Sequence, residues 1–165
     1  MNTSKTGGIE AENIRSLLDQ LTYFVIELEA QLPFLTRIAP EILSASSHEG
    51  AKPIRSYYED FLQREASLRS QLKELFNSTK SVQLGEQSKS QDWEIEGLVR
   101  RVINARKESV EIILGMEENN WRQLINVDAT EITFRSWIYG IVLEEADLLR
   151  EIGILFSEQQ LSFTR

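Results

Sequence analysis

Residues 133–156 read TFRSWIYGIVLEEADLLREIGILF, and this stretch has the clearest helical periodicity in the chain. Its apolar residues follow one another in steps of four and three with one position skipped, namely Phe134, Ile138, Ile141, Leu148, Ile152 and Leu155. Because an α-helix turns once about every 3.6 residues, this spacing places them on one stripe of a helix. The skipped position is Glu145, a carboxylate at the centre of a face that should be buried.

Three further segments carry the same kind of apolar stripe, so the sequence predicts an all-α protein with four long helices arranged as a bundle. The expected helices before the quoted stretch cover about residues 9–32, 53–77 and 92–114. Asp92 is a suitable N-cap for the third helix, and Gly115 is a suitable stop for it. Thr133 or Thr130 is expected to cap the fourth.

The segments between the helices indicate how the chain is organised. Residues 1–8 are polar and glycine-containing and are expected to form a disordered lead-in, while residues 9–161 form one domain. The polar segment 78–91 is long for a link between helices and is predicted to cross the bundle as a long crossover connection between helices 2 and 3. Residues 117–132 show no strand signal, but their apolar anchors should pack: Trp121, Leu124, Ile125 and Val127.

Composition narrows the classes of function. The chain has 165 residues and a net charge of -8, which repels phosphate backbones and argues against nucleic-acid binding. It has no cysteine, which excludes disulfides, thiolate metal sites and cysteine nucleophiles. No apolar run approaches the roughly 18 residues that span a membrane, and the first ten residues lack the apolar core of a signal peptide. A cytoplasmic protein that does not enter a membrane is therefore expected.

Three charged residues, which we call the charge cluster, interrupt three of the apolar stripes. Each lies eleven residues, close to three helical turns, after an apolar residue of its own stripe: Glu65 after Ile54, Arg106 after Ile95 and Glu145 after Phe134. A lone buried charge is costly, so an Arg between two Glu is the favoured arrangement. Three interpretations of these charges stay open. They form a structural ion network, or they lie at the edge of the apolar core, or they make a polar pocket that binds a ligand or assists proton transfer.

Three segments together resemble the DinB/YfiT-like family of four-helix bundles, and the likeness extends over about residues 9–156. PIRSYYEDFLQRE (53–65) resembles the family's second helix, in which a histidine precedes an acidic residue by five positions. VINARKESVEIIL (102–114) resembles the third helix, which often carries an Arg in this place. The stretch quoted at the outset resembles the last helix, which carries an H-x-x-x-H pair.

The resemblance implies a metal-dependent hydrolase or transferase fold, but it also implies that the metal site is degenerate here. The family binds a divalent metal through three histidines, and the matching positions in this chain are Asp60, Glu144 and Leu148. The only histidine, His48, lies in a loop and matches no family ligand. No cofactor is therefore expected, although two carboxylates can hold Mg²⁺ or Ca²⁺ weakly. Glu65 and Glu145 match acidic positions near the family's site, so the pocket can persist without the metal.

Three functions stay open from the sequence. The favoured hypothesis is a metal-free bundle that binds a small molecule or serves as an interaction module. The second is a hydrolase or thiol-transferase that uses carboxylate ligands or the charge cluster, and the third is a purely structural dimerising bundle. The resemblance also suggests a homodimer, for which the apolar residues off the main stripe, Leu143 and Ile154, offer a surface.

Overall fold

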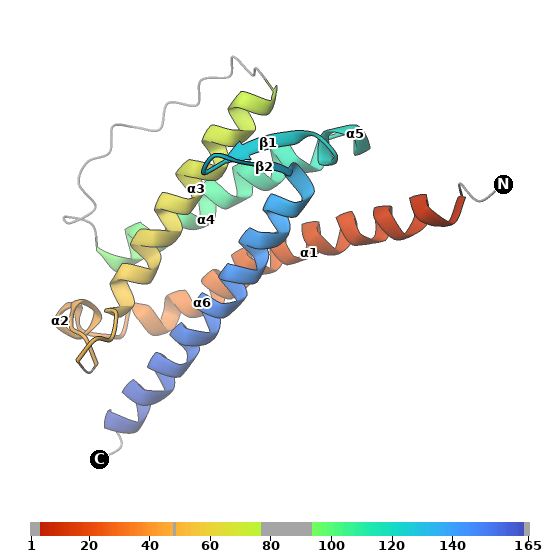
Figure 1. Ribbon diagram of the computed structural model, residues 1–165. Coiled ribbons are helices and arrows are strands. Elements are labelled where there is room, and N and C mark those ends of the chain that lie inside the picture. The colour runs from red at the N-terminus through yellow and green to blue at the C-terminus, as the bar shows by residue number, and fades with distance from the viewer. Residues whose placement is uncertain (1–3, 48, 77–93, 164–165) are drawn as a thin grey trace.

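The computed structural model describes residues 4–47, 49–76 and 94–163, and within them the chain is mostly helical, as predicted (Figure 1). The helices of the described residues are α1 (Ser4–Leu35), α2 (Pro40–Ser44), α3 (Ile54–Phe76), α4 (Ile95–Leu114), α5 (Glu118–Trp121) and α6 (Phe134–Phe163). A single hairpin of strands β1 (Leu124–Val127) and β2 (Thr130–Thr133) joins α5 to α6 in this part of the chain. None of the helices just named has both the length and the apolarity needed to cross a membrane.

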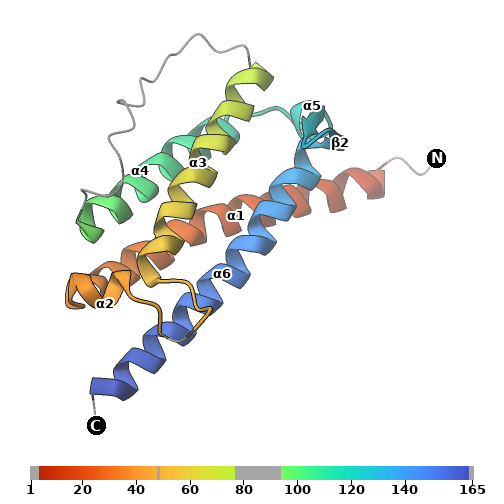
Figure 2. The ribbon, with the colours of Figure 1, turned by 60° about the vertical axis from the view of Figure 1, so that its left-hand side comes forward.

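The four long helices pack around a shared interior. α1 packs against α4 and α6, and α3 packs against the same two helices. α6 crosses α1 obliquely, and the start of α1 and the end of α6 point to different ends of the molecule (Figures 1 and 2). Every long helix therefore faces two others, which is why each carries a buried apolar stripe.

The apolar core consists of two clusters, and the helices pass from one to the other at the charge cluster. Along α3, Phe61 belongs to the first apolar cluster and Leu68 to the second, with Glu65 between them. Arg106 of α4 and Glu145 of α6 occupy the equivalent places on their helices, between Ile103 and Val110 and between Ile138 and Ile152. A layer of charge thus separates two apolar regions inside the protein.

α1 is longer than the sequence predicted at both ends. It begins at Ser4, inside the segment expected to be a disordered lead-in, and it continues through Pro33 to Leu35. Extending an existing helix is far easier than starting one, which accounts for the early start. Pro33 removes only one backbone donor close to the helix end, and the fully buried Leu35 favours completing the last turn. The N–H of Thr36 then donates to Leu32 O at 3.1 Å.

The hairpin corrects the expectation that residues 117–132 contain no strand. β1 and β2 pair antiparallel, with Ile125 opposite Ile132. Asp128 and Ala129 connect them with φ angles of 49° and 63°, as a tight two-residue hairpin turn requires. Each strand has only four residues, and the turn lacks the Gly that usually marks it, so the signal is weak.

The apolar anchors of that segment divide into two groups. Trp121 and Ile125 are buried in the second apolar cluster, and Val127 packs against it. Leu124 was expected to pack but is exposed, because the alternation of the strand turns it away from Ile125.

The end of α4 and the start of α6 lie at their predicted positions, whereas α6 continues to Phe163, beyond the predicted stretch 133–156. Thr133 caps α6, since the N–H of Ser136 donates to Thr133 Oγ1 at 3.1 Å. Gly115 ends α4, where its N–H donates to Glu111 O at 3.3 Å. Asp92, the expected cap of α4, and the predicted crossover 78–91 lie outside the described residues.

Candidate functional site

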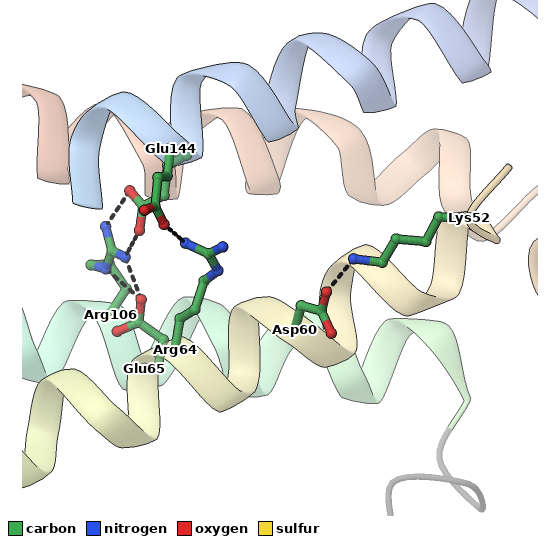
Figure 3. A network of polar contacts seen from close by, with 7 residues as sticks. Lys52, Asp60, Arg64, Glu65, Arg106 and Glu144 are labelled. Atoms are coloured by element: carbon green, nitrogen blue, oxygen red, sulfur yellow. Dashed lines mark hydrogen bonds and ion pairs between the residues drawn. The ribbon is translucent and has the colours of Figure 1, made fainter. Parts of the chain in front are cut away.

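The structure brings the three residues of the charge cluster together in the interior. Figure 3 labels two of them, Glu65 and Arg106. Arg106 of α4 lies between Glu65 of α3 and Glu145 of α6. Arg106 Nε donates to Glu65 Oε1 at 2.7 Å, and Nη1 donates to Glu145 Oε2 at 3.1 Å. Nη2 donates to both carboxylates as well. The exposed fractions of the three residues are 2%, 1% and 3% for Glu65, Arg106 and Glu145, so this is a buried network.

α1 contributes an aromatic ring to the same layer. The guanidinium carbon of Arg106 lies 4.3 Å from the centre of the Phe24 ring. The negative face of the ring attracts the cation, while the guanidinium edge stays free to donate hydrogen bonds. The arrangement lets one side chain contact α1, α3 and α6 at once, so Arg106 joins all four long helices.

Burial and the neighbouring charges change the pKa values of Glu65 and Arg106. Burial raises the pKa of Glu65 above its ordinary value of 4.5; the charge and hydrogen bonds of Arg106 oppose this shift, and Glu145 adds to it. Burial works against the charge on Arg106, but Glu145 and Glu65 outweigh it and raise the pKa of Arg106. Arg106 therefore stays charged, and Glu65 is a carboxylate that takes up a proton more readily than an exposed one.

One oxygen of the cluster lacks a partner. Glu65 Oε1 accepts both hydrogen bonds from Arg106, and the buried Oε2 has no hydrogen-bond partner among the described residues. An unpaired buried acceptor is costly. It favours protonation of Glu65, in keeping with the raised pKa.

A second buried arginine lies one turn further along α3. Arg69 is 5% exposed and donates to Glu108 of α4, on the surface side of the same helix pair. Its positive charge also lowers the pKa of Glu65, although less than Arg106 does. The charge cluster is thus supported by a second link between α3 and α4.

A groove between α1 and α6 reaches the charge cluster from outside. Its volume is about 270 Å³, and its lining comprises Gln20, Tyr23, Phe24, Glu27, Val142, Glu145, Ala146 and Leu149. We call it the α1–α6 groove. Both charged residues in this lining are acidic, Glu27 from α1 and Glu145 from α6. A hydrogen bond with Glu27 raises the pKa of the exposed Tyr23 hydroxyl, so these two side chains lie together at the rim.

The three positions that match the family's metal ligands do not form a common site. Asp60 forms an ion pair with Lys52, and Glu144 forms one with Arg64 (Figure 3). Leu148 packs against the first apolar cluster and has no donor atom. Both carboxylates therefore face cations from the protein itself.

The side chains present do not fit a metal of the family type. Among residues 4–47, 49–76 and 94–163, no group of three or more His, Asp or Glu is placed to hold a metal ion. Nickel and zinc sites of this kind need nitrogen donors, and His48 lies outside the described residues. Whether the protein binds a metal stays a prediction.

Helical periodicity predicts the charge cluster but not the parts of the site that α1 supplies, namely Gln20, Tyr23, Phe24 and Glu27. The one available signal was the pair Tyr23 and Glu27, which lies four residues apart and off the apolar stripe of α1. The burial of Arg69 could not be predicted from periodicity, because Leu68 occupies the apolar stripe and Arg69 is the next residue, off that stripe.

No protein-family model matches the sequence, and neither a curated protein nor a solved structure matches it.

Proposed function

We propose that this chain is a small-molecule-binding four-helix bundle of the DinB/YfiT kind that works without the family's transition metal. Two features support the bundle: the packing of each long helix against two others, and the order of the three segments that resemble the family. One observation carries the binding function. Glu145 lines the α1–α6 groove and also belongs to the buried charge cluster, so a ligand in the groove meets a charged group held by Arg106.

The lining of the groove favours a cationic ligand. Its two charged side chains are carboxylates, and the exposed ring of Tyr23 offers a face that attracts cations. Glu145 already accepts hydrogen bonds from Arg106 at both oxygens, but a carboxylate has about four acceptor positions and can take a further donor. The volume lies just below the roughly 300–1,000 Å³ of drug-sized sites, so the ligand is a small organic ammonium compound.

A matched set of compounds tests this proposal. Butylammonium, butyrate and butanol share one chain length and differ in charge, and tetramethylammonium tests a cation that donates no hydrogen bond. We expect the two cations to raise the melting temperature and to give binding heats, because a ligand that binds only the native state stabilises it. Butyrate should have no effect, since Glu27 and Glu145 repel it.

Two variants locate the binding. Glu27→Gln should weaken cation binding about tenfold, which corresponds to about 1.4 kcal/mol. Glu131→Gln makes the same change on the exposed hairpin and should leave binding as in the parent. A larger response to butyrate than to butylammonium, or equal binding by the parent and Glu27→Gln, would contradict the proposal.

The enzyme and the purely structural bundle, the two other functions that the sequence leaves open, would give different results in these experiments. A hydrolase or thiol-transferase with carboxylate ligands would need a cation at Asp60 or Glu144, where the ion pairs with Lys52 and Arg64 now lie. A purely structural bundle would bind none of the four compounds. No arrangement of the described residues favours either function over ligand binding.

A further inference from the structure

The charge cluster carries one more negative than positive charge when both of its carboxyl groups are ionised. Arg106 supplies one positive charge, Glu65 and Glu145 supply two negative ones, and all three side chains are almost fully buried. The next charges outward, Arg69 and Glu108, neutralise each other in an ion pair of their own. A buried net charge is costly because the surrounding protein solvates it poorly. The interior therefore favours the uptake of one further positive charge.

The cluster has two places where that charge can be supplied. The first is Glu65 Oε2, a buried oxygen with no hydrogen-bond partner among the described residues, which can accept a proton. The second is Glu145, whose carboxylate lines the α1–α6 groove and can meet a cation that enters from solvent. Arg106 links the two carboxylates, since its Nη2 donates to both. A charge that arrives at one carboxylate thus acts on the other across a single side chain.

We propose that the two positive charges compete, so that a cation bound in the α1–α6 groove releases a proton from Glu65. In this exchange the O–H bond of Glu65 breaks, the electron pair stays on Oε2, the proton passes to solvent, and the cation pairs with Glu145. The cluster together with its added charge is neutral before and after. This regulation rests on the proposed cation binding and makes that binding depend on pH.

The groups around Glu65 explain how the two events are coupled. Burial and Glu145 of α6 raise the pKa of Glu65, whereas Arg106 of α4 and Arg69 of α3 lower it. α1 contributes the uncharged ring of Phe24 to this layer. A cation beside Glu145 offsets the negative charge that raises this pKa, and so favours the ionised form of Glu65. By thermodynamic reciprocity, protonation of Glu65 must weaken cation binding by the same factor.

Tetramethylammonium tests the exchange, because it keeps its charge at every pH and has no acidic proton of its own. Adding it to weakly buffered parent protein should release up to about one proton per chain, measured with a pH electrode. The same concentration of sodium chloride is the control and should release much less. The affinity for tetramethylammonium should rise at least about fivefold as the pH is raised from about 5 to about 9. The infrared band of a protonated carboxyl group should disappear as the cation binds.

Two variants assign the released proton. Glu65→Gln removes the titrating group and has the charge of the protonated state. It should release no proton, and at every pH it should bind tetramethylammonium as weakly as the parent does at about pH 5. Glu144→Gln is the matched control, because it removes a neighbouring carboxylate that belongs to neither the charge cluster nor the groove lining. Its proton release and affinity should be those of the parent.

These measurements separate the proton exchange from cation binding itself. Binding by the parent without proton release, or equal proton release by Glu65→Gln, would overturn the exchange and leave the cation site standing. Absence of binding by the parent and both variants at every pH would overturn both. The parent's proton release and infrared band need no substitution, so they decide the question even if circular dichroism shows that Glu65→Gln is unfolded.

Discussion

Arg106 Nε donates a 2.7 Å hydrogen bond to Glu65 Oε1, between residues that lie 41 positions apart in the chain. Both residues are almost fully buried, so the pair holds α3 against α4 at a place where apolar packing is interrupted. Removing two charges from water is costly, and this cost is recovered only when the hydrogen-bond geometry is good and few groups are left unpaired. The fork of Arg106 meets that condition by serving two carboxylates, and only Glu65 Oε2 is left over among the described atoms.

Replacing Arg106 with methionine should destabilise the protein strongly. Two carboxylates would then face each other in a poorly solvated space, and breaking a buried pair in this way costs about 3–5 kcal/mol. Replacing Glu65, Arg106 and Glu145 together with apolar residues should cost much less, because no unpaired charge remains. Urea unfolding at pH 7 measures both. A loss below about 1 kcal/mol for Arg106→Met would show that the cluster behaves like an exposed pair.

The stability of the parent should respond to acid through Glu65. Because the pKa of Glu65 is raised in the folded state, the folded protein binds a proton more tightly there than the unfolded chain does. This contribution is complete below the ordinary value of 4.5 and is lost as the pH rises through the raised pKa. The parent should therefore gain stability relative to Glu65→Gln as the pH falls from 7 toward 4.5. Arg106→Met should gain more, since it lacks the cation that lowers the pKa of Glu65. Unfolding curves that stay parallel over this range would argue against the raised pKa.

The Tyr57 hydroxyl should lose its proton at a higher pH than an ordinary tyrosine does. Burial and a 2.9 Å hydrogen bond that its hydroxyl donates to Glu151 raise the pKa of Tyr57 to about 12, from an ordinary value of 10.0. Absorbance titration of the parent and Tyr57→Phe should differ by one phenol that ionises near pH 12. The same shift stabilises the fold below pH 10, and this stability is lost as the pH rises toward 12. A difference spectrum centred near pH 10 would contradict the prediction.

The purified protein should contain no stoichiometric transition metal. Leu148 has no donor atom, and Asp60 and Glu144 form ion pairs with Lys52 and Arg64. Elemental analysis should find far less than one zinc or nickel per chain, and a chelator should leave the melting temperature unchanged. The prediction is falsified if one metal per chain is found and is lost on replacing Asp60 or Glu144 with alanine.

The hairpin turn should tolerate glycine better than the alanine it carries. Ala129 has a φ of 63°, a conformation that costs a residue with a Cβ atom roughly 1 kcal/mol or more. Ala129→Gly should therefore raise the free energy of unfolding by about 0.5–1 kcal/mol despite the freedom that glycine adds to the unfolded chain. Ala30→Gly, in the exposed face of α1, is the control and should lower it by about 1 kcal/mol. Destabilisation by both changes would mean that Ala129 makes contacts that outweigh its backbone strain.

Periodicity determined which side chains of each helix are buried, and the charge cluster is the clearest case. Glu65, Arg106 and Glu145 each lie eleven residues along their own stripe, and eleven residues return to nearly the same face of a helix. Local geometry therefore predicted that all three lie on the apolar stripes, and the packed fold buried them together. The hairpin was missed for the converse reason: four-residue strands with an Asp-Ala turn carry too short a pattern to compete with the helical periodicity around them.

Local patterns in the sequence thus predicted the helical class, the apolar stripes and the residues that interrupt them. They could not determine which helices are neighbours, because that depends on crossing angles and axial offsets that arise only when side chains pack. Tertiary structure alone placed Phe24 against Arg106, joined Tyr23 and Glu27 to the wall of a groove, and left Glu65 Oε2 without a partner. Asp60 and Glu144 show the same limit, since only the packed fold set Lys52 and Arg64 against them. Position on a helix face is a local property of the chain, whereas the partner across an interface depends on the whole set of packed helices.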